Sequence, residues 1–410
     1  MRIAYLILEN GAVFKGWSFG YDGGAIGELV FSTGMTGYME TLSDPRYFGQ
    51  IVIQTFPLIG NYGVIPAEMR SPKLHLNAYI VREWCQEPSN FRSEGNLDSF
   101  LCDNKIPGIC GVDTRALTRI IRENGAMNAM VSKSPELGSE QWALLRGYRV
   151  EGAVSAVCAE REYTGSAMYA PGAGQGLSSG QGRGQGLSSG QGPGVVQGPG
   201  SGLNVVLWDF GDTFGLVEGL ATNGCGVRCV RFDSSASDIS ALSPDGVVLS
   251  DGPGDPAENT EIIREIGLLC DTGIPLLGVG LGHRLLALAR GAKTEKLLFG
   301  HHGANQTVSE RESGKVFVTS QNHLYSVSAG SPPARSEISY LNANDGSCEG
   351  ITYRDVPAFS VEFAPTEDVF LKFIACMVNE TRSASKSDLN GPSQSASDHP
   401  PVAEDLKGGE

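Results

Sequence analysis

The sequence of 410 residues lacks long hydrophobic runs and is short of positive charge. No segment approaches the roughly 20 consecutive apolar residues that a membrane-spanning helix needs, which argues against a membrane protein. Its 31 Lys and Arg residues are outnumbered by 46 Asp and Glu residues. The resulting net charge of -15 argues against non-specific binding to nucleic acid or to an anionic membrane surface.

The sequence also lacks closely paired cysteines. It has nine, an odd number, and none forms a C-x-x-C pair. The two nearest in sequence, Cys225 and Cys229, are expected to be apolar residues beside a turn and a strand rather than metal ligands. Reduced, scattered cysteines are typical of the cytoplasm, so a cytoplasmic location is predicted.

Composition divides the chain into four parts. Residues 1–160 mix short strand runs with turn signals and helical segments, which indicates a mixed domain. Residues 161–202 contain GQGLSSGQG twice and cannot bury a core, so a flexible linker is predicted. Residues 203–382 form a second domain, and the Ser- and Pro-rich residues 383–410 are predicted to be a disordered tail.

Local signals place some elements within residues 1–160. Asn10-Gly11 lies between two alternating runs and predicts a hairpin. In DTRALTRIIRENGA, Asp113 or Thr114 is positioned to cap a helix that ends before Gly125.

The second domain predicts an α/β fold. Buried apolar runs such as NVVLWDFG, VRCVRF, DGVVLS and PLLGVG alternate with amphipathic helical segments. This alternation is typical of a doubly wound, mostly parallel sheet, to which GKVFVTSQNH and EGITYRD add antiparallel strands.

The stretch LLGVGLGHRLL, residues 276–286, predicts a strand that turns sharply into a helix. A dinucleotide-binding fingerprint would need a third glycine where the sequence has His283, so nucleotide binding is disfavoured. The alternative is a nucleophile elbow, in which the apex residue points its side chain upward from a strained turn. Here the apex is Gly280, which has no side chain.

At this point the sequence resembles a known family. GVGLGHRLLALARGAKTEKLLFGHHGAN is similar to the G-[IV]-C-L-G-H-Q segment of class I glutamine amidotransferases. More narrowly, the chain resembles the glutamine-hydrolysing small subunit of carbamoyl-phosphate synthase. GELVFSTGMTGYMETLSDPRYFGQ, GICGVDTRALTR, LSDGPGDP, TSQNH and NDGSCEGI follow in that family's order and span nearly everything but the linker and the tail.

The resemblance implies a Cys-His-Glu triad, and this chain has lost it. The nucleophile position is Gly280, the base position is Ala364 and the orienting position is Thr366. Glycine supplies no nucleophile and alanine cannot move a proton, so a glutaminase-dead chain is predicted. Glu367 is one candidate for a displaced orienting group. Glycine tolerates positive φ and should relax the elbow.

The glutamine-site positions that the resemblance implies are partly kept and partly changed. Kept are Gly252, Gly254, Leu281 and Asn322, whereas Arg46, Arg284, Leu324 and Tyr325 replace Ser, Gln, Gly and Phe. Two arginines and a leucine should obstruct glutamine. The new guanidinium groups either bind an anion or extend to solvent as products of drift, and drift is favoured.

Histidines remain near these positions without an evident chemical role. His283 and His323 are structural in the family. Adjacent His301 and His302 point apart on an extended chain, with no carboxylate or Cys at ligand spacing, so no metal site is predicted.

The resemblance implies a partnership with the large synthetase subunit, which makes carbamoyl phosphate for arginine and pyrimidine biosynthesis. ATP and metal are expected only on that partner, and no cofactor on this chain. The leading hypothesis is a structural or regulatory pseudoenzyme. The alternatives are a stand-alone anion-binding module that uses Arg46 and Arg284, a residual amidohydrolase with an unrecognised nucleophile, and a decaying gene copy.

Overall fold

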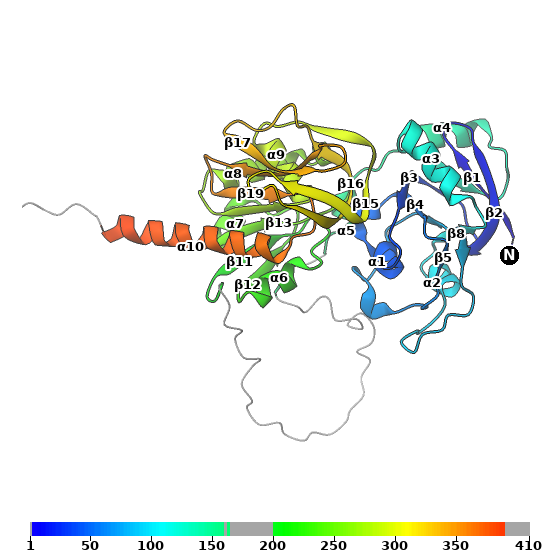
Figure 1. Cartoon of the computed structure of the whole chain (residues 1–410), viewed down its shortest axis with the longest axis horizontal. Helices are drawn as coiled ribbons and strands as arrows, with labels where there is room; N and C mark the ends of the chain where they lie inside the picture. The colour runs from blue at the N-terminus through cyan, green and yellow to red at the C-terminus, as the bar shows by residue number, and fades with distance from the viewer. Residues whose placement is uncertain (1, 160–161, 165–199, 390–410) are drawn as a thin grey trace, which may run out of the picture.

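The computed structural model describes residues 2–159, 162–164 and 200–389. Figure 1 shows two units side by side, a barrel at the amino-terminal end of the chain and a large sheet flanked by helices. The repeats of the predicted linker lie outside the described residues.

The amino-terminal unit is a closed barrel. Its strands follow one another around the barrel as β1 (Ile3–Leu8), β2 (Val13–Gly20), β8 (Pro107–Cys110), β6 (Ala78–Ile80), β4 (Gln50–Gln54), β3 (Ala25–Ser32) and β9 (Met127–Ser132). The predicted hairpin at Asn10-Gly11 is confirmed, since β1 and β2 pair antiparallel on either side of it.

The helices of this unit are α1 (Tyr38–Ser43), α2 (Leu97–Asp103), α3 (Thr114–Asn124) and α4 (Ser139–Gly147), whereas α5 (Ala153–Val157) packs on the sheet unit through Val154. The predicted cap of α3 is confirmed, because the Asp113 side chain accepts a hydrogen bond from the Ala116 amide at 3.0 Å. Gly125 ends the helix with φ 92°, a value that favours glycine. Leu117 and Ile121 of α3 pack on one face of the barrel strands.

The second unit is built on a ten-stranded sheet. Its order is β10 (Tyr163–Thr164), β12 (Gly226–Val230), β11 (Asn204–Trp208), β13 (Gly246–Leu249), β14 (Leu276–Val279), β19 (Ala358–Val361), β18 (Cys348–Tyr353), β16 (Val316–Val327), β15 (Thr294–Glu310) and β17 (Ser336–Asn342). The strands from β12 to β19 pair in parallel, and β18 to β17 form an antiparallel extension. The predicted α/β fold class is confirmed.

Side chains of the parallel strands point alternately to the two faces of the sheet, and each face packs against a layer of helices. Val206 and Trp208 of β11 pack with the helices on one face, which are α7 (Ala236–Ala241), α8 (Thr260–Cys270) and α9 (Leu281–Ala289). Val205 and Leu207 face the other side, where α6 (Leu216–Thr222) and α10 (Glu367–Leu389) lie. Within the described residues, no helix is both long and apolar enough to cross a bilayer.

Two predicted boundaries differ from the structure. Tyr163 and Thr164, inside the predicted linker, pair with β12 as the edge strand β10. Helix α10 continues to Leu389, past the predicted start of the tail at residue 383. The rest of the predicted tail, residues 390–410, lies outside the described residues.

Candidate functional site

The turn between β14 and α9 keeps the backbone of a nucleophile elbow. Its apex, Gly280, has φ 52° and ψ -110°, a conformation in which a side chain would be strained. The Gly280 amide donates a hydrogen bond to the Val361 carbonyl at 2.9 Å, which fixes the turn against β19. The turn therefore keeps the elbow conformation, but the residue at its apex has no side chain that could act as a nucleophile.

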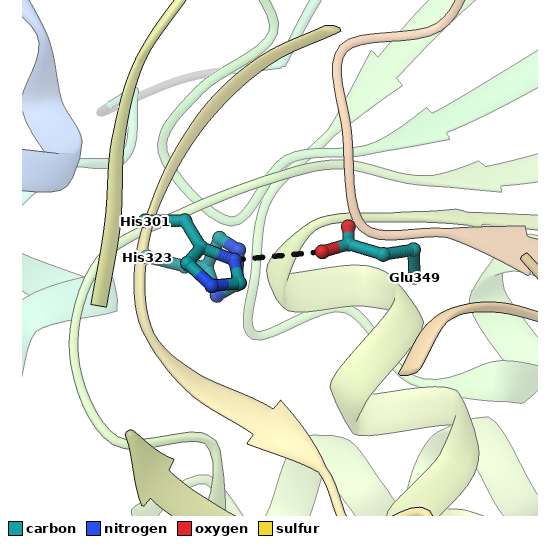
Figure 2. Close-up of side chains that lie close together, drawn as sticks. All are labelled: His301, His323 and Glu349. Atoms are coloured by element: carbon teal, nitrogen blue, oxygen red, sulfur yellow. Dashed lines mark ion pairs between the residues drawn. The ribbon is translucent and has the colours of Figure 1, made fainter. Parts of the chain in front are cut away.

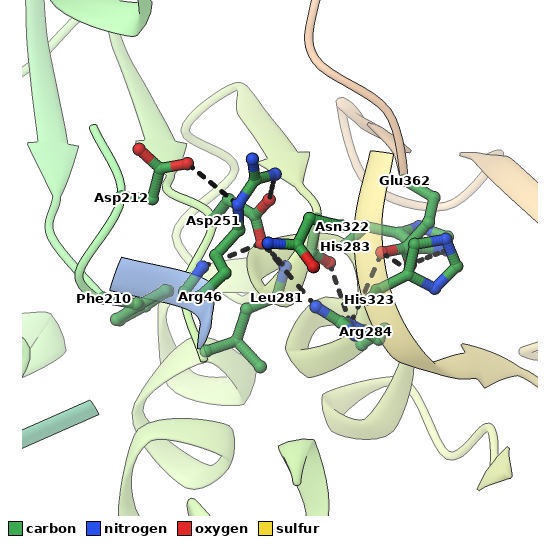
Figure 3. A network of polar contacts seen from close by, with 12 residues as sticks. Arg46, Phe210, Asp212, Asp251, Leu281, His283, Arg284, Asn322, His323 and Glu362 are labelled. Atoms are coloured by element: carbon green, nitrogen blue, oxygen red, sulfur yellow. Dashed lines mark hydrogen bonds and ion pairs between the residues drawn. The ribbon is translucent and has the colours of Figure 1, made fainter. Parts of the chain in front are cut away.

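A carboxylate fills the space beside the elbow. A Cβ built on Gly280 would lie 2.1 Å from the Asp251 carboxyl carbon and Oδ1. The same Oδ1 accepts hydrogen bonds from the backbone amides of Gly252 at 2.8 Å and Leu281 at 2.7 Å. These amides belong to the GPG turn and to the residue after the elbow, the positions predicted for glutamine contacts (Figure 3).

Arg46 is buried, which contradicts the prediction that it extends to solvent. It lies in a short 3-10 turn, Pro45–Tyr47, and its side chain forms ion pairs with three carboxylates. The N–O distances are 2.7 Å to Asp44, 2.9 Å to Asp251 and 3.2 Å to Asp212. Because Asp212 and Asp251 lie in the sheet unit, Arg46 also joins that unit to the barrel (Figure 3).

Arg284 is also buried, with 2 % of its surface exposed. It lies 3.6 Å from Asp251 and 3.6 Å from Glu362, and it donates to the carbonyls of Gly280 and Tyr325 at 3.3 and 3.2 Å. The interpretation of both arginines as solvent-exposed drift is therefore wrong. The guanidinium charges of Arg46 and Arg284 face carboxylates of the chain itself, so neither arginine is available to bind an external anion as predicted.

Burial and neighbouring charges set the protonation of this cluster in opposite directions. Burial opposes ionisation of Asp44, but the charges of Arg46 and Arg70 outweigh it and lower the pKa of Asp44. Burial raises the pKa of Glu362 well above its ordinary range, despite the nearby Arg284. Neither Glu362 oxygen has a hydrogen-bond partner among the described residues, which fits a neutral carboxyl group.

His283 is held neutral under the elbow. Its ring is fully buried, and Nδ1 lies 2.7 Å from the Ser360 hydroxyl. Burial, followed by the charge of Arg284, lowers the pKa of His283 to about 3. This geometry fits the predicted structural role, because the ring is buried below the turn and contacts Ser360 of β19.

The two other triad positions lie at the surface. Ala364 and Thr366 are exposed in the segment between β19 and α10, where the Ala364 amide donates to the Ser320 carbonyl at 3.1 Å. Glu367 is exposed at the first residue of α10. These positions offer no buried base or orienting group for the elbow.

Seven of the eight predicted glutamine-site residues line one cavity, and the eighth, Leu281, is buried in the core of the sheet unit. The cavity has a volume of about 470 Å³ and lies between the barrel and the sheet, and its walls include Arg46, Gly252, Gly254, Arg284, Asn322, Leu324 and Tyr325. Asn322 bridges the two units, since its amide donates to Asp44 at 3.0 Å and its oxygen faces His302 at 2.7 Å. Leu324 is buried in the core of the barrel unit, and Tyr325 is half-buried.

Sequence reasoning missed Asp251, although one signal was present. Asp251 follows β13 by two positions, at the carboxyl end of a parallel strand. In open α/β sheets this edge is where ligand-contacting residues gather.

A second polar cluster contains three possible metal ligands. His301, His323 and Glu349 each place one ligand atom within 4.8 Å of the others (Figure 2). The expectation that no carboxylate accompanies His301 is wrong, because Glu349 lies 3.4 Å from it and Asp345 lies 2.8 Å from it. Amides of Gln321 and Asn342 already donate to the two Glu349 oxygens at 2.8 and 2.9 Å, which favours a structural network.

His301 should make the stability of the fold depend on pH. Burial disfavours its charge, but its hydrogen bonds to Asp345 and Glu349 prevail and raise its pKa to about 9, from 6.5. Protonated His301 therefore stabilises the folded chain. This stabilisation is fully present below about pH 6.5 and is lost as pH rises through about 9. The difference in unfolding free energy between the natural chain and His301→Gln, measured by urea unfolding, should therefore shrink from pH 6 to pH 10.

The same series with Asp345→Asn is the control for this prediction. Removing the carboxylate should lower the pKa of His301 and move the loss of stability to lower pH. A difference between the natural chain and His301→Gln that stays constant from pH 6 to pH 10 would show that His301 is not charged in the fold.

The chain matches two family models. Residues 6–131 match the carbamoyl-phosphate synthase small chain, CPSase domain, and residues 206–367 match glutamine amidotransferase class-I. The chain is 39 % identical to the carbamoyl phosphate synthase small chain of Clostridium perfringens, over 88 % of this chain and 93 % of that protein. It is 41 % identical to that of Bacillus caldolyticus, over 88 % and 90 %. The crystal structure of a glutamine amidotransferase from Thermotoga maritima aligns with a TM-score of 0.34 at 15 % identity, over 45 % of this chain and 85 % of that one.

Proposed function

This chain belongs to the family of carbamoyl phosphate synthase small chains, and we propose that it is a member without glutaminase activity. The observation that carries this proposal is Gly280 at the apex of the elbow. Acyl transfer from glutamine needs a nucleophile at that point and a base within hydrogen-bond reach. The exposed Ala364 and Thr366 supply neither a base nor an orienting group.

The proposed role is that of a structural or regulatory subunit. Its partner would be the large chain of carbamoyl phosphate synthase, which would hold ATP and metal and work in the cytoplasm for arginine or pyrimidine biosynthesis. Matches in both units over most of the chain support a retained docking function. Without glutamine hydrolysis, the complex would use free ammonia.

The two alternative functions lose support. A stand-alone anion-binding module would need free guanidinium groups, but Arg46 and Arg284 face internal carboxylates. A residual amidohydrolase would need an activated nucleophile. Burial raises the pKa of the seven cysteines whose pKa is shifted, the opposite of thiolate activation: Cys110, Cys158, Cys225, Cys229, Cys270, Cys348 and Cys376.

The test is a synthesis assay with the purified chain and the large chain of the same organism. We expect no ammonia release from glutamine above the buffer blank, and carbamoyl phosphate formation with ammonium chloride but not with glutamine. A family small chain with cysteine at the elbow is the positive control. Glutamine-supported synthesis would refute the loss of activity, and failure to co-elute with the large chain would refute the partnership.

A further inference from the structure

We propose that the backbone amides beside the elbow form a carboxylate-binding site whose permanent ligand is the side chain of Asp251. This inference rests on the proposed function and deepens it. Two separate features would then prevent glutamine hydrolysis. Gly280 provides no nucleophile, and the Asp251 carboxylate occupies the amides that a substrate oxygen would need.

Four donor groups converge on the Asp251 carboxylate. The amides of Gly252 and Leu281 bind Oδ1, and Arg46 donates to Oδ2 at 2.9 Å. The Arg284 guanidinium lies 3.6 Å from Oδ1. Two aligned amides and two guanidinium groups are the donors that proteins use to hold a carboxylate or a developing oxyanion.

The position of Asp251 excludes both a nucleophile and a substrate oxygen. A side chain on Gly280 would have its Cβ 2.1 Å from Oδ1, well inside van der Waals contact. The carboxylate cannot easily move aside, because the two amides and Arg46 hold it in a site that is 7 % exposed. An oxygen of a tetrahedral intermediate would have to displace it from the same amides.

The site should survive removal of its ligand. Without Asp251, Arg46 keeps its ion pairs with Asp44 and Asp212, and Arg284 keeps its hydrogen bonds to the Gly280 and Tyr325 carbonyls. Asp251→Ala would therefore leave a hole lined by two amides and two guanidinium groups. A small external carboxylate such as formate matches the group that was removed.

The first experiment measures thermal unfolding of the full-length Asp251→Ala chain during formate titration. We expect a saturable rise of several degrees in Tm, which sodium chloride at equal ionic strength does not produce. The natural chain and Asp251→Asn, whose amide still fills the hole, should show no such rise. If Asp251→Ala needs help to fold, its refolding yield in formate against chloride replaces Tm. An equal response of Asp251→Ala to formate and chloride would overturn the proposal.

The second experiment places cysteine at the elbow in two backgrounds. Gly280→Cys should lower Tm strongly in the natural chain and much less in Asp251→Ala, because only the natural chain has a carboxylate in the way. The strain of positive φ is present in both backgrounds and cancels. Equal losses would show that Asp251 does not occupy this space.

Neither experiment depends on glutamine turnover, so the two proposals fail separately. A chain that hydrolyses glutamine refutes the proposed function. A chain that is inactive but shows no formate response and no coupling between positions 251 and 280 refutes only the carboxylate site.

Discussion

Replacing Gly282 by alanine should lower the free energy of unfolding by about 3 kcal/mol or more. A Cβ on Gly282 would lie 2.3 Å from the Leu249 carbonyl oxygen, a backbone atom of the central strand β13. The first turn of α9 rests directly on that strand, and no side-chain rotation can relieve the contact. Urea unfolding of Gly282→Ala and of the natural chain measures the loss of unfolding free energy, provided that the two chains have the same m-value.

Gly267→Ala is the matched control for this substitution. Gly267 lies inside α8, and an added Cβ would meet no atom within 4 Å. Alanine is the better helix former, so Gly267→Ala should raise the free energy of unfolding by about 0.5–1 kcal/mol. If Gly282→Ala were as mild as Gly267→Ala, the close approach of α9 to β13 would be wrong.

Gly280 and Gly282 show why the stretch LLGVGLGHRLL could be interpreted from sequence. A strand that turns sharply into a helix requires glycine where φ is positive, as at Gly280, and this requirement is local to the sequence. The same holds for the Asn10-Gly11 hairpin and the Asp113 cap. The alternation of apolar runs with amphipathic segments predicted the α/β sheet for the same reason.

Closure of the barrel was beyond local reasoning. It depends on β3 pairing in parallel with β4 and antiparallel with β9, which lies far along the chain. Residues 1–160 were therefore predicted only as a mixture of strands and helices. Strand β10 was missed for a similar reason, since two residues carry too little pattern to reveal their pairing with β12.

In the candidate site too, features set by local sequence could be predicted and those set by distant contacts could not. The loss of side chains at Gly280 and Ala364 could be recognised in the sequence because motifs surround both positions. The fate of Arg46 could not, because its partner Asp251 is 205 residues away and on the other unit. From sequence alone, an unexpected arginine side chain can be assigned only to a ligand or to solvent, because sequence does not place distant carboxylates beside it. Here the fold supplies three carboxylates.

Arg46→Met should lower the free energy of unfolding at pH 7 by about 3–5 kcal/mol, because it breaks a buried ion network from one side. The substitution keeps an apolar stem but leaves Asp44, Asp212 and Asp251 around a missing charge. Arg70 still lies 2.6 Å from Asp212 and cannot compensate all three.

The dependence of this loss on pH identifies its cause. In the natural chain the arginines lower the pKa of Asp44 below its unfolded value, so their contribution is present above about pH 4 and is lost as pH falls further. The difference between the natural chain and Arg46→Met should therefore shrink as pH falls from about 4 to about 3 and below. Arg46→Lys, which keeps the charge but not the planar fork, should show a smaller loss at pH 7. A loss that is equal at pH 7 and pH 3 would point to packing of the side chain instead, and the charges around Arg46 would not be what joins the barrel to the sheet.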